Sequence, residues 1–246
     1  MYRILITGGA GYIGTMLTEE LLRRGHIVTC VDRLFFGNDK IIQFVDNPNY
    51  RIIQEDTRYM PESVMRNMDV VIDMAALSND PLGELVKGKT EEINHRARIR
   101  NNAMAKKAGV KKYILISSCS VYGAQNSTCT EKTQPNPVST YAVCNVKAEQ
   151  ILKNATKDFC VTALRLATVF GKSHRMRFDL AVNVMTLRAF KNNKIIVLGQ
   201  GLQWRPLVHV KDVCRAICKV IQAEPDIVNK QVFNVGRNDN NRRIIN

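Results

Sequence analysis

Glycines cluster near the N-terminus, between an apolar run and an amphipathic segment. The run Tyr2–Ile6 precedes the stretch Thr7-Gly8-Gly9-Ala10-Gly11-Tyr12-Ile13-Gly14, and apolar residues then recur at helical spacing as far as Leu21. This order predicts a strand that turns sharply into a helix. The start of a helix carries unpaired N–H groups and a partial positive charge, which suit a pyrophosphate when no side chain blocks its approach. The feature therefore predicts a dinucleotide-binding loop.

An acidic residue supports this interpretation. The loop matches Gly9-x-Gly11-x-x-Gly14, and Asp32 ends the next apolar run, Ile27–Val31, eighteen residues past Gly14. A carboxylate there can accept hydrogen bonds from the adenosine ribose and repels a 2′-phosphate, so we expect NAD rather than NADP. The alternative, a glycine-rich turn with a surface aspartate, is disfavoured because strand, loop, helix and acid come in the expected order.

Short β-branched runs alternate with helical patterns through the first two thirds of the chain. The further predicted strands are Arg51–Gln54, Val70–Met74, Tyr113–Ser117 and Val161–Leu166, with longer helices around Glu91–Ala108 and Thr140–Lys157. Such alternation predicts an α/β fold: a Rossmann-type doubly wound parallel sheet with helices on both faces. Its ligand crevice should lie at the carboxyl ends of the strands.

The rhythm changes after Gly171, so we expect two regions: a dinucleotide-binding Rossmann domain over 1–170 and a small substrate-binding region over 171–246. The second region contains a helical run to Asn192, a short strand Ile195–Leu198 and the turn Gly199-Gln200-Gly201. A strand-like segment, Gln231–Val235, then returns to the first domain.

Composition narrows the function classes. No stretch approaches the roughly 20 apolar residues of a membrane span, and no secretory signal is visible, so we expect a cytoplasmic protein without a membrane partner. The seven cysteines form no C-x-x-C pair, which favours reduced thiols. Cys214 and Cys218 share a helical face without a nearby histidine, so packing is favoured over metal binding. We expect no metal.

The net charge of +14 is spread along the chain, which favours attraction of anionic metabolites. The densest basic cluster lacks interleaved aromatic residues and comprises Lys106, Lys107, Lys111 and Lys112. Nucleic-acid binding is therefore the weakest alternative, and we expect no nucleic-acid partner.

Two later segments carry a family resemblance. The stretch Ser117-Ser118-Cys119-Ser120-Val121-Tyr122-Gly123 follows a predicted strand, and Tyr141 comes shortly after Pro135-Asn136-Pro137. With the glycine loop, these segments resemble the extended short-chain dehydrogenase/reductase family, specifically its NAD-dependent nucleotide-sugar epimerases and dehydratases. The resemblance runs from Met1 to about Asn234.

The resemblance implies NAD as cofactor and assigns residues to it. Its phosphate-binding glycines fall on Gly8, Gly11 and Gly14, and its ribose-binding acid falls on Asp32. The other implied cofactor contacts are Tyr12, Ile13, Asp56, Thr57, Ala75, Ala76, Asn94, Ser117, Tyr141 and Asn145.

The resemblance also implies a nucleotide-diphosphate sugar as substrate, with transient oxidation of a ring hydroxyl. Ser118 and Tyr141 would be catalytic, because a tyrosinate can take the hydroxyl proton while the serine hydroxyl bonds the same oxygen. The implied substrate contacts are Asn79, Ser118, Arg175, Asn183 and Arg205, the last holding the diphosphate.

One position departs from the family pattern. Tyrosine has an ordinary pKa of about 10, and the family lowers it with a lysine four residues later. Here that position is Asn145, which takes the third catalytic place, and Lys147 projects from another helix face. We expect retained cofactor binding and turnover reduced by about 10²–10⁴, which Asn145→Lys should raise. The alternative is a catalytically inactive NAD-binding paralogue with a sensing or assembly role.

The resemblance has two further implications. Relatives continue past Phe233-Asn234-Val235-Gly236, so the substrate region is expected to be truncated, as in a shortened paralogue or a form completed by a partner subunit. A homodimer is expected through the two longer helices.

Overall fold

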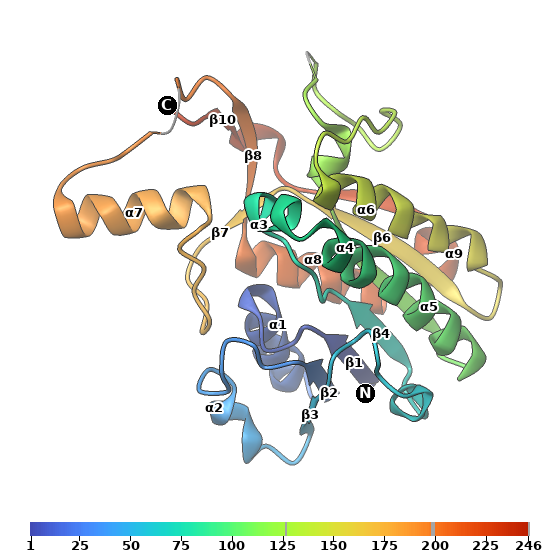
Figure 1. Ribbon diagram of the computed structural model, residues 1–246. Helices are drawn as coiled ribbons and strands as arrows, with labels where there is room; N and C mark the ends of the chain where they lie inside the picture. The colour runs from blue at the N-terminus through green and yellow to red at the C-terminus, as the bar shows by residue number, and fades with distance from the viewer. Residues whose placement is uncertain (126, 198–199, 246) are drawn as a thin grey trace.

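A seven-stranded parallel sheet forms the centre of the protein (Figure 1). The computed structural model describes residues 1–125, 127–197 and 200–245. The strand order is β3-β2-β1-β4-β5-β6-β9. The strands are β1 (Arg3–Thr7), β2 (Ile27–Asp32), β3 (Tyr50–Gln54), β4 (Val70–Asp73), β5 (Lys112–Ser118), β6 (Cys160–Leu166) and β9 (Val232–Val235).

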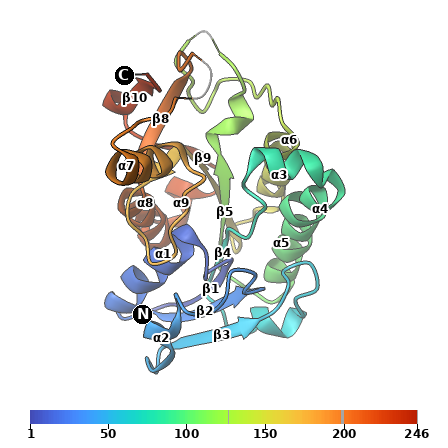
Figure 2. The same ribbon diagram turned by 60° about the vertical axis from the view of Figure 1, so that its left-hand side comes forward.

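Helices cover both faces of this sheet (Figure 2). The longer helices are α1 (Tyr12–Arg23), α5 (Ala97–Lys107), α6 (Thr140–Ala148), α7 (Ala181–Asn192) and α8 (Val210–Gln222). The shorter ones are α2 (Ile42–Val45), α3 (Asp80–Leu85), α4 (Lys87–Glu91) and α9 (Pro225–Val228). The predicted doubly wound Rossmann-type fold is confirmed.

The β-branched strands are apolar on both sides because both faces of the sheet are buried. On one face Ile4 and Ile72 pack with Leu17 of α1 and Ile217 of α8. On the other face, Leu5, Val71 and Leu115 pack with Ala105 of α5 and with Ile151, just after α6. Two apolar layers therefore hold the strand ends, and the loops that follow them, in fixed positions.

A second, three-stranded sheet stands beside the carboxyl end of the first. It has the order β10-β8-β7 and is built from β7 (Thr168–Phe170), β8 (Trp204–His209) and β10 (Asn241–Arg243). The strand expected at 195–198 is wrong over 195–197, where the chain is irregular, and Leu198 and Gly199 lie outside the described residues. Ile195 and Ile196 are 60% and 50% exposed, so their β-branched side chains do not pack on the buried face of a sheet.

The two long helices expected from periodicity are interrupted. The first consists of α4, a π-helical turn over Glu92–Arg96 and α5. The second ends as α6 at Ala148 and continues as a 3-10 helix over Glu149–Asn154. In the part of the chain that the structure describes, no helix has the length and apolar character needed to cross a membrane.

Candidate active site

The glycine loop follows β1 and leaves no room for side chains. Gly8 has φ +71°, and a Cβ there would lie 2.9 Å from the Cα of Ala75. A Cβ on Gly14 would lie 2.5 Å from the carbonyl oxygen of Gly9. Gly11 precedes α1 without a side-chain hydrogen bond to the helix start. The first turn of α1, which includes Tyr12 and Ile13, therefore offers main-chain amides to an anion.

Asp32 lies at the end of β2, next to this loop. Its Oδ1 accepts from the N–H of Leu34 at 2.8 Å, and its Oδ2 accepts from the N–H of Ala10 at 3.1 Å. Burial raises the pKa of the Asp32 carboxyl, and these two hydrogen bonds oppose the rise. Each carboxylate oxygen keeps a further lone pair with which it can bind a ribose hydroxyl.

Asp56 and Thr57 follow β3, one strand further out. Arg58 hydrogen-bonds the Asp56 carboxylate, with its Nη2 2.8 Å from Oδ2, and thereby lowers the pKa of Asp56. Thr57 is buried. The Asp56 carboxylate is thus held ionised just after β3, where the resemblance places an adenine contact.

Two residues that the sequence did not single out fix the alanine pair after β4. Thr7 donates its hydroxyl to Asp73 at 2.7 Å and accepts from the N–H groups of Met74 and Ala75 at 3.1 and 3.2 Å. Thr7 is fully buried, and Asp73 is 1% exposed. These bonds hold Ala75, and with it Ala76, against Gly8.

Asn94 clamps the segment beyond the alanine pair. Its Oδ1 accepts from the N–H of Leu77 and its Nδ2 donates to the carbonyl of Leu77, both at 2.8 Å. Asn94 is fully buried within the π-helical turn. Its position agrees with the predicted role of steadying the cofactor pocket, and that role stays a prediction.

The two neighbouring serines at the end of β5 have different surroundings. Ser117 is 2% exposed and donates to Glu149 at 2.7 Å, and Glu149 also pairs with Arg165. Ser118 is half-buried, and its Oγ accepts from the N–H of Ser120 at 3.2 Å. Ser118 can therefore present its hydroxyl proton at the strand end, whereas Ser117 belongs to a buried polar network.

Tyr141 lies in the first turn of α6. Ser139 caps this helix, because its Oγ accepts from the N–H of Ala142 at 3.2 Å. The helix packs against β5 and against the turn Cys119–Tyr122 that follows it. The catalytic pair that the resemblance implies, Ser118 and Tyr141, therefore comes from two adjacent elements at the carboxyl edge of the sheet.

Asn145 lies one turn further along α6 and is fully buried. Its Nδ2 donates to the carbonyl of Tyr141 at 3.0 Å, and its Oδ1 accepts from Nη1 of Arg98 at 2.9 Å. Sequence reasoning missed Arg98, since nothing in the spacing of α5 distinguishes it from the other basic residues there. The contact of Asn145 with a nicotinamide ribose stays a prediction.

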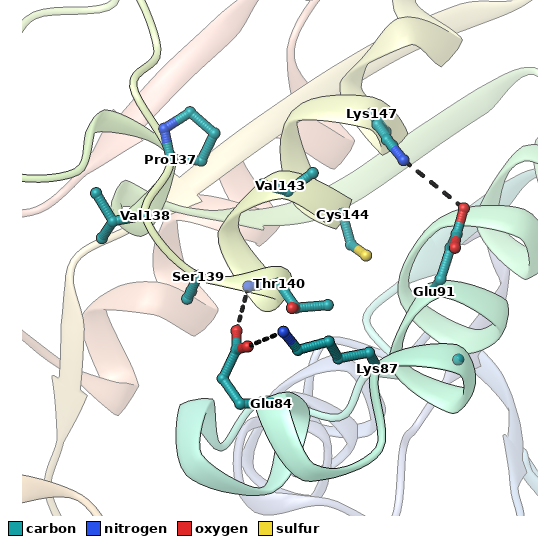
Figure 3. Close-up of a pocket in the computed structure, with 11 residues that line it drawn as sticks. Glu84, Lys87, Glu91, Pro137, Val138, Ser139, Thr140, Val143, Cys144 and Lys147 are labelled. Carbon is teal, nitrogen blue, oxygen red and sulfur yellow. Dashed lines mark hydrogen bonds and ion pairs between the residues drawn. The ribbon is translucent and has the colours of Figure 1, made fainter.

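Lys147 lies on the outer side of α6 and does not replace the missing lysine. Its Nζ is 3.7 Å from Oε1 of Glu91, across a pocket between α3, α4 and α6. Figure 3 shows Lys147 turned toward Glu91, with Glu84 and Lys87 at the other end of the pocket. This placement agrees with the different helix face that its spacing predicts.

Two of the predicted substrate residues, Asn79 and Asn183, hydrogen-bond segments that are distant in the chain. Asn79 caps α3 and donates to Asp179 at 3.1 Å. Asn183 of α7 is buried, and its amide accepts from the N–H of Gly171 at 3.1 Å and donates to the hydroxyl of Tyr12 at 3.3 Å. Asn183 thus joins the substrate region to the glycine loop.

The two predicted substrate arginines differ in their surroundings. Arg175 is half-buried and lies over the ring of Phe36, 3.7 Å from the centroid, where its charge also acts on Asp32. Arg205 is exposed on β8 and pairs in register with Arg242 of β10. Two guanidinium groups on adjacent strands suit a diphosphate. No group of three His, Cys, Asp or Glu side chains among the residues described could hold a metal ion.

Comparisons with known proteins agree with this arrangement. Residues 4–236 match the model of the "NAD dependent epimerase/dehydratase family". The chain belongs to this family. It is 31% identical to UDP-N-acetyl-alpha-D-glucosaminuronate decarboxylase of Bacillus cytotoxicus over 247 aligned positions, which cover 96% of this chain and 75% of that protein.

Solved structures show the same similarity. MoeE5, solved with UDP-glucose and NAD, has a TM-score of 0.83 and 30% identity, covering 95% of this chain and 76% of that one. UDP-glucuronic acid 4-epimerase from Bacillus cereus, at 24% identity, has a TM-score of 0.89, covers 99% of this chain and 80% of its own, and shows the common fold.

The family's cofactor is NAD, and the residues present fit it. Gly8 and Gly14 let the loop pack closely against main-chain atoms of Ala75 and Gly9, and the first turn of α1 that follows presents main-chain amides suited to a pyrophosphate. Asp32 can bind the adenosine ribose. The expected cofactor and family are confirmed.

Proposed function

We propose that this chain oxidises a ring hydroxyl of a nucleotide-diphosphate sugar transiently and then completes an epimerisation or a dehydration. The observation that carries the proposal is the position of Ser118 and Tyr141. Ser118 ends β5 at the carboxyl edge of the sheet, and Tyr141 lies in the first turn of α6, which packs against β5. The similar proteins named above support a UDP-sugar as substrate, because one is a UDP-sugar decarboxylase and another was solved with UDP-glucose bound.

In this proposal three side chains and the cofactor carry out the oxidation of the sugar hydroxyl. The Tyr141 phenolate takes the proton of the sugar hydroxyl, while Ser118 donates a hydrogen bond to the same oxygen. NAD, when bound, accepts the hydride that the sugar carbon loses, and returns it later in the same turnover. Arg205 holds the diphosphate and so keeps the sugar ring in reach of Tyr141.

The test is turnover with defined sugars. Purified protein is incubated with NAD and a panel of UDP-sugars, and products are identified by mass spectrometry and proton NMR. We expect an altered sugar with wild type, none with Tyr141→Phe, and a loss of about 10²–10⁴ with Ser118→Ala. Folded protein that gives no calorimetric heat with NAD would contradict the proposal.

A second candidate is a catalytically silent NAD-binding protein with a sensing or assembly role. The observation that favours it is Asn145 at the position of the family's lysine, with both ends of its amide bonded inside the protein. NAD binding without turnover of any sugar in the panel would favour this candidate. Turnover that depends on Tyr141 would exclude it.

We also propose a homodimer and retain the predicted cytoplasmic location. In the dimers expected from the resemblance, the interface is formed by the helices that here are α5 and α6. The segments α4 and α6 pack together, and α5 packs against the 3-10 helix that extends α6, so these helices form one layer (Figure 1). Sedimentation that shows only monomer would remove the dimer from the proposal.

A further inference from the structure

The guanidinium of Arg98 hydrogen-bonds Asn145, the residue at the position of the family's lysine. We propose that Arg98 is a positioning residue that supplies, beside Asn145, a positive charge at the cofactor pocket. The inference rests on the proposed function, because it assigns Arg98 a part in the same reaction. It concerns a residue of α5, outside the segments that carry the family resemblance.

The contacts place this charge against α6 and against the cofactor pocket together. Nη1 of Arg98 donates to Oδ1 of Asn145 at 2.9 Å, and Nη2 donates to the carbonyl of Ala75 at 3.3 Å. Asn145 in turn donates to the carbonyl of Tyr141. A lysine at position 145 would extend beyond the asparagine amide, into the space where the guanidinium begins. Arginine from α5 and asparagine from α6 together therefore occupy the place of one long cationic side chain.

The charge of Arg98 is buried without an ion pair. Arg98 is 2% exposed, and its Nε has no hydrogen-bond partner among the residues described. Within the described part of the chain, no carboxylate lies within 4.0 Å of its guanidinium. A buried cation without a counter-ion is costly to the fold, and such groups are typical of functional sites.

Titratable groups on three elements surround Arg98. Burial raises the pKa of Cys144 on α6 and of Tyr113 on β5, and the charge of Arg98 lowers both by a smaller amount. The Tyr113 hydroxyl also contacts the carbonyl of Arg98 at 3.4 Å. Asp73 on β4 accepts hydrogen bonds from the hydroxyls of Thr7 and Tyr113, one on each carboxylate oxygen.

The π-helical turn before α5 accounts for the direction of the Arg98 side chain. Glu92–Arg96 has one residue more per turn than an α-helix, which rotates the start of α5 relative to α4. Asn94 within this turn faces Leu77, and Arg98 one turn later faces Ala75. Both side chains thus reach the loop after β4, which borders the cofactor pocket.

The test compares Arg98→Met, which keeps the volume and removes the charge, with wild type. We expect about tenfold weaker NAD binding by calorimetry, because the cofactor pocket loses a positive charge. Arg98→Lys should retain most of the wild-type values.

Three further variants make the test decisive. Lys107→Met, on the same helix but exposed, should leave NAD binding unchanged. Asn145→Asp pairs the guanidinium with a carboxylate of nearly the same shape, so it should act like Arg98→Met even if that variant folds poorly. Asn145→Lys should raise the rate most in the Arg98→Met background, where it is the one cation at the site.

The outcomes separate the two proposals. Absent NAD binding or absent turnover in wild type contradicts the proposed function. If folded Arg98→Met and Asn145→Asp both keep wild-type NAD affinity, the charge of Arg98 has no part at this site and the inference is overturned.

Discussion

Gly8 provides a direct test of the cofactor loop, because the chain contains matched glycines. Gly8, Gly25 and Gly109 have φ values of +71°, +77° and +78°. A Cβ on Gly25 or Gly109 would meet nothing within 4 Å, whereas on Gly8 it would lie 2.9 Å from the Cα and 3.0 Å from the N of Ala75. Alanine at the three positions thus has the same backbone strain, and only at position 8 does it collide with main chain.

The magnitudes follow from these two effects. A left-handed backbone costs alanine about 1–2 kcal/mol at each position. Overpacking against the backbone of Ala75 adds about 1–3 kcal/mol at Gly8. At about 2–4 °C per kcal/mol for a chain of this size, Gly25→Ala should lower the Tm by about 2–8 °C, and Gly8→Ala by about 2–12 °C more.

Thermal unfolding followed by circular dichroism measures the stability, and calorimetry measures NAD binding. Gly8→Ala should also weaken NAD binding, because relief of the collision moves Ala75 in the cofactor pocket, and Gly25→Ala should not. If Gly8→Ala, Gly25→Ala and Gly109→Ala lower the Tm equally and leave NAD affinity equal, the reasoning is refuted. The close approach of Gly8 to Ala75 would then not shape this loop.

Three other predictions give independent checks. Asp32→Ser should narrow the preference for NAD over NADP, because the carboxylate that repels a 2′-phosphate is gone; an unchanged ratio of the two dissociation constants would argue against this role. Arg177 lowers the pKa of Asp179 from 3.8 to about 2, so the stability this pair contributes is present above about pH 4 and is lost as the pH falls toward 2. The Tm difference between wild type and Asp179→Asn should accordingly stay constant from neutral pH to about pH 4 and shrink below it. Burial raises the pKa of Cys30 and of Cys214 to about 12, so iodoacetamide at neutral pH should label the less buried Cys129 before either of them, as read by mass spectrometry of the folded protein; early labelling of Cys30 would contradict the packing described for β2.

The core of the fold could be predicted because its signal is local. Strands buried on both faces are continuous β-branched runs, and the predicted Ile27–Val31 differs from β2 by one residue. The strand predicted at 195–198 shows the limit of this signal. Isoleucines there have strand propensity, but a strand also needs a partner, and the partner of a segment is set by distant parts of the chain.

The site was predictable where residues act through the main chain, and less so where they act through side-chain contacts. Gly8 and Asp32 are set by the turn after one strand and the end of the next. Arg98 was missed because the π-helical turn, which rotates α5, leaves no mark in periodicity. Its contact with Asn145 joins residues 47 positions apart, which no short motif can indicate.

The hydroxyl of Tyr12 joins the glycine loop to the segment that follows β7. It donates to the carbonyl of Gly171 at 2.6 Å, while Ser173 donates to the carbonyl of Tyr12, also at 2.6 Å. The first turn of α1 is therefore held to the first residues of the proposed substrate region. Under the proposed function, a ligand that shifts this junction from one side changes the affinity on the other, and thermodynamic reciprocity makes the two effects equal in size.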